Sequence, residues 1–464
     1  MIYRIYPSKD TWITDLVPDF IPVVPVTGSN FGASEILEVF KKNPLSSGSA
    51  GWAGSSSLGH ILLQFDLSGW SQLTASLQAP SIAMWRLVLH DARHAETLPS
   101  SYDLEALALS QSWDEGSGLD EDTFRDLGQA NWIQGRSNVY WTVPGGDVLA
   151  DDISSFHLDT GHEDVDFDVG TIVNDWLAGT FPNNGLLVRV SSSLETSNSD
   201  FYVKKFHGRQ TNFLDRRPYL EARWDDSFRD DRNNFVFDAP SVLFLYNEVR
   251  GQLTNLAGVS AGPNCLDVRI NDLSGTVLAT SASWTGHVGI YSASFILPSG
   301  SYSGSVFHDV WTSGSRLFVS GTFYPSSPAP QSVLAPGRYV ASIPNLKNEY
   351  TVDENPELRV FVSSFDYNPV VVLTGSQPVP AGFIISRGYY RIDNDRTKEQ
   401  VIPFGTASYY GGTDWTRLSY DGNGNYFSFF MSSLSPGNVY RIVFLFDQDG
   451  QRQIVDGGFK FRVT

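Results

Sequence analysis

Most of the chain consists of short runs in which apolar and polar side chains alternate, interrupted by Gly, Asn, Asp, Ser or Pro. A period of two places every second side chain on the same face, as in a half-buried β-strand. The clearest runs are rich in β-branched or aromatic residues, and they span residues 60–66, 84–90, 185–190, 359–362 and 440–446. This pattern predicts an all-β protein.

Residues 168–177 depart from this period. Val169, Ile172, Val173 and Trp176 recur at helical spacing behind an acidic start. We expect one short helix here. Residues 421–425 (DGNGN) resemble the start of a calcium-binding loop, but its twelfth position would be Ser432 instead of Glu, so a hairpin turn is the better interpretation.

Two stretches divide the chain into modules. A chain of 464 residues is too long for one hydrophobic core. Residues 225–234 are charged with little to bury, and the proline-rich residues 325–337 are typical of a semi-rigid spacer. We therefore predict a jelly-roll-like β-sandwich over residues 1–225, followed by two immunoglobulin-like sandwiches over residues 235–325 and 337–464.

The net charge disfavours one class of partner, and the cysteine count excludes intrachain disulfides. The chain has 51 acidic and 32 basic side chains and a net charge of −19, which repels a polyphosphate backbone and disfavours direct nucleic-acid binding. Cys265 is the only cysteine, so no intrachain disulfide can form, and packing is its expected role. No apolar run has the length of a signal peptide or a membrane span, so we expect synthesis in the cytoplasm and no membrane partner.

One acidic loop is a candidate calcium site. Dense carboxylates suit a hard cation such as calcium, although their order is not that of an EF-hand, and a solvated acidic face remains the alternative. The candidate ligands are Asp114, Glu115, Asp120, Asp122 and Asp126. No other cofactor is predicted.

Four tryptophans are candidates for stacking on sugar rings, because they lie in or near predicted loops of the first module: Trp52, Trp70, Trp132 and Trp141. The alternative for each is a place in the core. For catalysis the sequence offers no nucleophile elbow, phosphate-binding glycine loop or zinc-protease motif, so no catalytic residue is predicted. The pair His90 and His94 and the polar residues 157–164 fit surface loops better than metal sites.

The first module contains an ordered set of motifs: residues 10–13 (DTWI), 60–68 (HILLQFDLS), the helix ending in Trp176, 184–187 (NGLL), 201–205 (FYVKK) and 217–221 (RPYLE). In this order they make the module resemble the DNRLRE family, a jelly-roll-like sandwich related to carbohydrate-binding modules. The long acidic segment 112–168 departs from the family, so a glycan site of its relatives cannot be placed on it.

The C-terminal part is similar to the last module of structural proteins from marine tailed bacteriophages, through residues 388–392, 402–405, 417–421 and 440–464. This resemblance implies a non-enzymatic virion protein, in a capsid decoration, neck, baseplate or tail fibre, that bridges other virion proteins as a symmetric homo-oligomer. A carbohydrate-binding host-attachment protein is the alternative. A glycan-degrading enzyme is a third reading, because scattered carboxylates can assemble in space.

Overall fold

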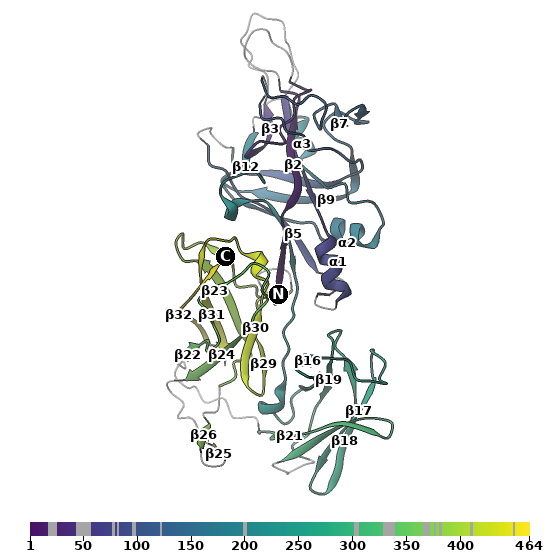
Figure 1. The fold of residues 1–464 in the computed structure, drawn as a ribbon, viewed down its shortest axis with the longest axis vertical. Coiled ribbons are helices and arrows are strands. Elements are labelled where there is room, and N and C mark those ends of the chain that lie inside the picture. Colours follow the sequence, from purple (N-terminus) through teal and green to yellow (C-terminus); the bar gives the residue numbers. More distant parts are fainter. Residues whose placement is uncertain are drawn as a thin grey trace, which may run out of the picture. The chain divides into compact units, whose positions relative to one another are not determined.

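The computed structural model describes residues 1–16, 26–42, 57–76, 79–80, 83–94, 99–120, 123–197, 202–300, 306–327, 339–364, 372–374, 377–379, 383–408, 412–448 and 451–464. These residues form two compact units. The N-terminal unit comprises Tyr3–Gln72 and Ser81–Arg223. The C-terminal unit comprises Met1–Ile2, Leu73–Pro80 and Trp224–Thr464. Each unit is built mainly from antiparallel strands (Figure 1).

The N-terminal unit is a β-sandwich of a four-stranded and a seven-stranded sheet. The first has the order β1-β13-β5-β10, from β1 (Ile2–Ile5), β13 (Tyr219–Arg223), β5 (Met84–Leu89) and β10 (Val165–Asp168). The second has the order β12-β3-β4-β11-β6-β9, with β2 beside β4. Its strands are β2 (Pro7–Thr14), β3 (Ile36–Lys42), β4 (Ser57–Phe65), β6 (Tyr102–Leu109), β9 (Val148–Leu158), β11 (Leu186–Val190) and β12 (Tyr202–His207).

Short elements complete the first part of the chain. They are the hairpin of β7 (Gln134–Arg136) and β8 (Val139–Tyr140), the helices α1 (Ser68–Ala75), α2 (Gly170–Ala178) and α3 (Ser192–Glu195), and the 3-10 turn η1 (Leu214–Arg216). The predicted helix is confirmed as α2, whose Ile172, Val173 and Trp176 are buried. Helices α1 and α3 were not predicted from the sequence. Neither has a long apolar stripe, and of α1 only Trp70 is fully buried.

The core of the middle sandwich of the C-terminal unit is formed by buried side chains from the sequence range Phe235 to Phe323. Its sheet has the order β14-β19-β18-β17-β20-β21. The elements are the 3-10 turn η2 (Asp231–Asn233) and the strands β14 (Ser241–Tyr246), β15 (Glu248–Val249), β16 (Gln252–Leu253), β17 (Leu266–Asp272), β18 (Gly275–Trp284), β19 (Ile290–Phe295), β20 (Phe307–Ser313) and β21 (Arg316–Phe323). Cys265 packs against this core, half-buried.

The last sandwich of the C-terminal unit has two sheets, ordered β22-β24-β30-β29 and β23-β32-β31-β27-β28. Their strands are β22 (Tyr339–Ser342), β23 (Glu349–Tyr350), β24 (Glu357–Ser364), β27 (Gly388–Asn394), β28 (Gln400–Ile402), β29 (Ser419–Asp421), β30 (Gly424–Ser428), β31 (Val439–Gln448) and β32 (Gln451–Val463), with a separate hairpin of β25 (Val372–Thr374) and β26 (Gln377–Val379) and the turn η3 (Met431–Ser433). Asp421 pairs with Gly424, which confirms the predicted hairpin.

The predicted all-β class, built from β-sandwiches, is confirmed. Two details differ from the expected modules. Met1 and Ile2 group with the C-terminal unit, because the fully buried Ile2 side chain joins the core of the last sandwich. The charged residues 225–234 are no simple solvated spacer either, since Asp230 is only 4 % exposed. The predicted proline-rich spacer lies largely outside the described residues.

Candidate functional site

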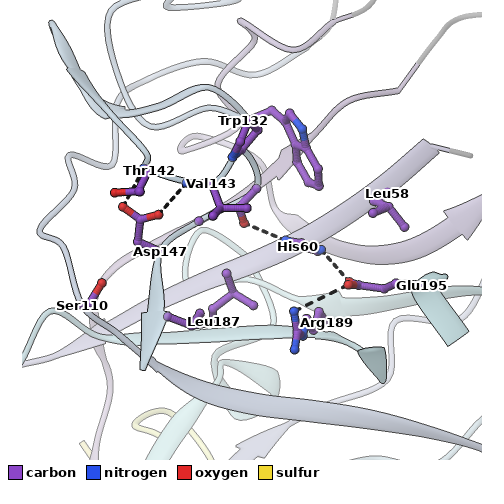
Figure 2. A pocket seen from close by; sticks show the side chains of 14 residues that line it. Leu58, His60, Ser110, Trp132, Thr142, Val143, Asp147, Leu187, Arg189 and Glu195 are labelled. Atoms are coloured by element: carbon purple, nitrogen blue, oxygen red, sulfur yellow. Dashed lines mark hydrogen bonds and ion pairs between the residues drawn. The ribbon is translucent and has the colours of Figure 1, made fainter. Parts of the chain in front are cut away.

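A pocket with a volume of about 460 Å³ opens over the seven-stranded sheet of the N-terminal unit (Figure 2). Strands β4, β9 and β11 contribute its floor through Leu58, Val148 and Leu187. Its walls come from Trp132 and from the loop over residues 142–147. This volume falls within the range of about 300–1,000 Å³ that is typical of small-molecule sites.

The strand period explains why a histidine faces this pocket. Leu58, His60 and Leu62 alternate along β4, so they lie on one face of the sheet. Leu62 is fully buried and lies opposite Leu187 of β11 in the antiparallel register. His60 therefore lies between two leucines on this face of the strand.

Both ring nitrogens of His60 face oxygen acceptors. Nδ1 lies 2.7 Å from the Gly145 carbonyl oxygen, and Nε2 lies 2.8 Å from Oε1 of Glu195. A neutral imidazole donates from one nitrogen only, so both contacts are hydrogen bonds only when the ring carries two protons. The ring then joins the loop over residues 142–147 to α3, as the dashed contacts in Figure 2 show.

Arg189 continues this chain of contacts on the next strand. Its Nη1 lies 3.6 Å from Oε2 of Glu195. Its Nε and Nη2 donate to Oε2 of Glu105 at 3.3 and 3.2 Å. Arg189 of β11 and Glu105 of β6 are direct partners in the antiparallel register, which explains their pairing.

The loop over residues 142–147 is fixed by its own hydrogen bonds. The Asp147 carboxylate accepts the backbone N–H groups of Thr142 and Val143, each at 2.8 Å. Gly145 donates its N–H to the Trp132 carbonyl oxygen at 2.7 Å. Its φ of +99° and the Trp132 ring, only 2.8 Å from where a Cβ would lie, require glycine at this position.

A further carboxyl group lies behind Leu58. Oδ1 of Asp15 accepts the Leu58 N–H at 2.6 Å. Burial raises the pKa of Asp15 and the charge of Glu195 adds to this rise, while the Leu58 N–H and His60 oppose it. The surroundings of the pocket are therefore rich in acidic groups.

The four candidate tryptophans occupy different environments. Trp132 lines the pocket, and its ring centroid lies 4.8 Å from that of His60. Trp141 is 5 % exposed and donates its Nε1–H to the Asn131 carbonyl oxygen. Trp70 is 1 % exposed and packs edge-on against Trp85. Trp70 and Trp141 thus fill the interior of the sandwich, and Trp52 lies outside the described residues.

The carboxylates of the candidate calcium loop have separate partners. Glu115 binds Arg209 Nη2 at 2.6 and 2.7 Å. Asp120 accepts the N–H groups of Thr123 and Phe124, and Asp126 accepts the Ser117 N–H.

Asp114 is half-exposed, with Lys9 Nζ 3.9 Å away. Asp122 lies outside the described residues. In the described part of the chain no three His, Cys, Asp or Glu side chains are grouped to hold a metal ion. The calcium site stays a prediction.

Sequence reasoning did not single out His60, Glu195, Arg189 or Asp147. One signal was available for two of them. His60 and Arg189 are polar residues at inward-facing positions of strands that are otherwise apolar, in SLGHILLQF and LLVRV. Glu195 and Asp147 carried no comparable signal, because α3 and the 142–147 loop bring them to the pocket only in the folded chain.

The pocket contains two carboxylates, but both are engaged. Each oxygen of Asp147 accepts a backbone N–H, and Glu195 contacts His60 and Arg189. A general acid or nucleophile needs a carboxyl oxygen directed at the substrate. The described contacts therefore single out neither carboxylate as a catalytic group.

Comparison with known proteins assigns no family. No protein-family model and no curated protein match the sequence. Among solved structures, alpha-2-macroglobulin of E. coli is similar at a TM-score of 0.18 and 10 % identity over 87 % of this chain, which spans 22 % of the length of that protein. The fibronectin(III)-like modules of Clostridium thermocellum CbhA are similar at a TM-score of 0.15 and 11 % identity, over 52 % of this chain and 93 % of theirs. At these TM-scores the similarity assigns no function.

No helix in the described ranges is both long and apolar enough to span a bilayer.

Proposed function

We propose that this chain is a non-catalytic structural protein of a virus particle, in which its β-sandwich modules bridge or anchor other virion proteins. The setting in a tailed bacteriophage rests on the resemblances of the first and last modules. The observation that carries the structural role is the way in which residues 228–233 connect the two sandwiches of the C-terminal unit.

These residues make paired contacts with both sandwiches. The Asp231 carboxylate accepts the Val242 N–H of the middle sandwich at 2.8 Å and the Tyr420 hydroxyl of the last sandwich at 2.7 Å. The backbone of Tyr420 exchanges hydrogen bonds with that of Phe228 and Asp230. A connection of this kind restrains both neighbours, unlike the flexible linker of a tethered module.

A buried ion pair strengthens the same connection. Arg232 donates from Nη1 and Nη2 to the two oxygens of Asp309, at 2.6 and 2.8 Å. Asp309 is fully buried and also accepts the Trp311 Nε1–H. Bidentate pairs of this type fix orientation as well as adding energy. A module pair restrained in this way suits a component that transmits contacts between neighbouring subunits.

Mass spectrometry of purified particles tests the proposed setting. We expect peptides of this chain in particles purified through two successive density gradients, at a constant ratio to the major capsid protein. Immunogold labelling would then locate the chain on the capsid, neck or tail. Its loss from particles during purification, while the capsid protein is retained, would contradict the proposal.

The copy number has its own test. We propose that the chain assembles as a symmetric homo-oligomer in the particle, because closed symmetry is the usual arrangement of repeated subunits. Light scattering of the purified chain should give an integral multiple of 51.3 kDa. Cross-linking within the particle should give the same multiple.

Carbohydrate binding for host attachment is the second candidate, and the pocket around His60 favours it. An apolar floor, an indole ring and hydrogen-bonding groups around the rim are features of sites for small polar ligands. A glycan array probed with the folded chain tests this function independently of particle composition. Release of reducing sugar from any bound glycan would contradict the non-catalytic assignment.

A further inference from the structure

The basic side chains that line the His60 pocket, within the described part of the chain, are His60 and Arg189. Both already contact acceptors of the protein. Arg189 contacts Glu105 through Nε and Nη2, and its Nη1 is directed toward Glu195. His60 faces Gly145 and Glu195 with its two nitrogens. An anionic ligand would therefore find no positive group that is not already neutralised by the protein.

Carboxylates outnumber these two basic groups at the same place. Glu195 and Asp147 line the pocket, and Glu105 lies behind Arg189. A sulfate, phosphate or carboxylate in the pocket would lose its hydration and approach these carboxylates without a paired cation. Burying a charge without such a partner is costly.

The uncharged groups of the pocket are suited to a sugar ring. Leu58 and Val148 provide apolar surface, with smaller contributions from the largely buried Leu187 and Trp132. Ser110 and Thr142 contribute hydroxyl groups, which can both donate and accept hydrogen bonds. A neutral sugar has C–H groups for the apolar surface and hydroxyls for the acceptors.

We infer that the pocket around His60 binds an uncharged segment of a glycan and excludes sulfated or uronate-containing segments. This selectivity rests on the second candidate function, carbohydrate binding. The inference specifies the chemical class of ligand that fits the geometry and the paired charges of the site.

A glycan array of matched pairs tests the inference. Neutral hexose oligosaccharides are printed beside their sulfated and uronate counterparts and probed with the full chain. We expect binding to neutral members, with at least a tenfold weaker signal for the charged member of each pair. Equal or stronger binding of the charged members would overturn the selectivity while leaving carbohydrate binding intact. An array without any signal from the folded chain would overturn both.

One substitution at the rim, with a matched control elsewhere in the chain, assigns the binding to this pocket. Val143 is 63 % exposed, so a larger side chain there can cover the opening without disturbing the core. We expect Val143→Trp to weaken binding of the best neutral oligosaccharide at least tenfold in calorimetry. The matched control is Val249→Trp, at a position 51 % exposed in the C-terminal unit, which should leave affinity unchanged. Equal affinity of the Val143→Trp variant and the parent would place the glycan elsewhere and overturn the site.

A charge substitution tests the electrostatic argument separately. Val143→Lys supplies the unpaired cation that the lining lacks, so we expect it to raise affinity for the sulfated counterpart at least fivefold. Val249→Lys adds the same net charge at the control position, which does not line the pocket, and should produce no such gain. An equal gain in both variants would show that net charge, and not the pocket, governs selectivity.

Discussion

At the scale of single residues, the sequence pattern indicated several candidate functional side chains. It did not indicate which residues these side chains contact in the folded chain. Glu115 was grouped with neighbouring carboxylates as a calcium ligand. In the folded chain it binds Arg209 and accepts the Asp10 N–H at 2.8 Å. Arg209 is 94 residues away along the chain. Spacing arguments reach only near neighbours, so contacts of this kind were invisible in the sequence.

Asp10 gives a testable consequence for pH. It is 1 % exposed, and burial raises its pKa to about 7, with Glu115 adding to the rise and the Arg209 N–H opposing it. Between about pH 4 and pH 7 the folded chain holds a proton that the unfolded chain releases. The contribution of Asp10 to the free energy of unfolding therefore falls as pH rises through this window.

We expect Asp10→Asn to be more stable than the parent at pH 8 by about 1–3 kcal/mol, and nearly equal to it at pH 4. Urea unfolding at the two pH values measures the difference. Asp353→Asn, at an exposed side chain, is the control and should show no such pH dependence. A constant difference at both pH values would show that Asp10 keeps its charge in the folded chain.

A buried triad of charges gives a second prediction. Glu221 accepts hydrogen bonds from Arg4 Nε and Arg223 Nε, both at 2.6 Å, and all three side chains are less than 10 % exposed. Burial acts to raise the pKa of Glu221, but the two guanidinium groups hold it below its usual value. Its contribution to stability is present above the unfolded pKa and is lost as pH falls through the folded one.

Glu221→Gln removes the carboxylate that both buried guanidinium groups share, and we expect a loss of about 3–5 kcal/mol at pH 7. Chemical denaturation measures this loss. Exposed Glu349→Gln should change stability by less than about 0.5 kcal/mol. Similar effects of the two substitutions would mean that the triad adds little to the fold.

At the scale of elements, the period of the hydrophobic pattern was most successful for long strands that pack on both faces. The predicted strands at residues 60–66 and 440–446 appear as β4 and β31. Helix α1 was missed because it has only one fully buried residue, Trp70, and therefore no repeated apolar spacing. The pocket was missed for a related reason, since β4, β11 and two loops meet there only after the sheet has formed.

The end of α2 gives a prediction for a single element. Gly179 has φ +74°, and its N–H is directed at the carbonyl oxygens of Asp175 and Trp176. An added Cβ would meet no atom within 4 Å, so only the backbone conformation opposes a side chain there. We expect Gly179→Ala to cost about 1 kcal/mol in thermal unfolding, and Gly179→Asn to cost less.

Gly128→Ala is the matched control, because its Cβ would also meet open space and its φ is not positive. It should leave stability unchanged or slightly raised. Equal losses at positions 128 and 179 would contradict the role assigned to the left-handed conformation.

At the scale of the whole molecule, the composition and the strand pattern predicted β-sandwiches, and the net charge of −19 disfavoured nucleic-acid partners. The extent of each folded unit was only partly predicted. The chain has two compact units, and the second of these contains two cores. The charged residues 225–234 read as a spacer because their partners, among them Asp309 and Tyr420, lie far along the chain. No local pattern records such a connection.

Because the described residues form two compact units, we expect the two units to unfold in separate transitions. We expect two transitions in scanning calorimetry of the intact chain. Leu62→Ala in the N-terminal unit and Ile442→Ala in the C-terminal unit both create cavities at fully buried positions, at a cost of about 2–5 kcal/mol each. Each variant should lower the temperature of one transition and leave the other in place. A single transition lowered by both variants would show that the chain unfolds as one cooperative body.

The pairing of β32 has a mechanical consequence. This 13-residue strand is bonded along most of its length to antiparallel β31, and Glu349 and Tyr350 of β23 add a parallel pairing beside Arg462 and Val463. A force pulling along the axis of β32 loads many of these hydrogen bonds in shear at the same moment, instead of opening them one after another. The last sandwich can therefore resist tension along this strand, a property that would suit the virion role proposed above.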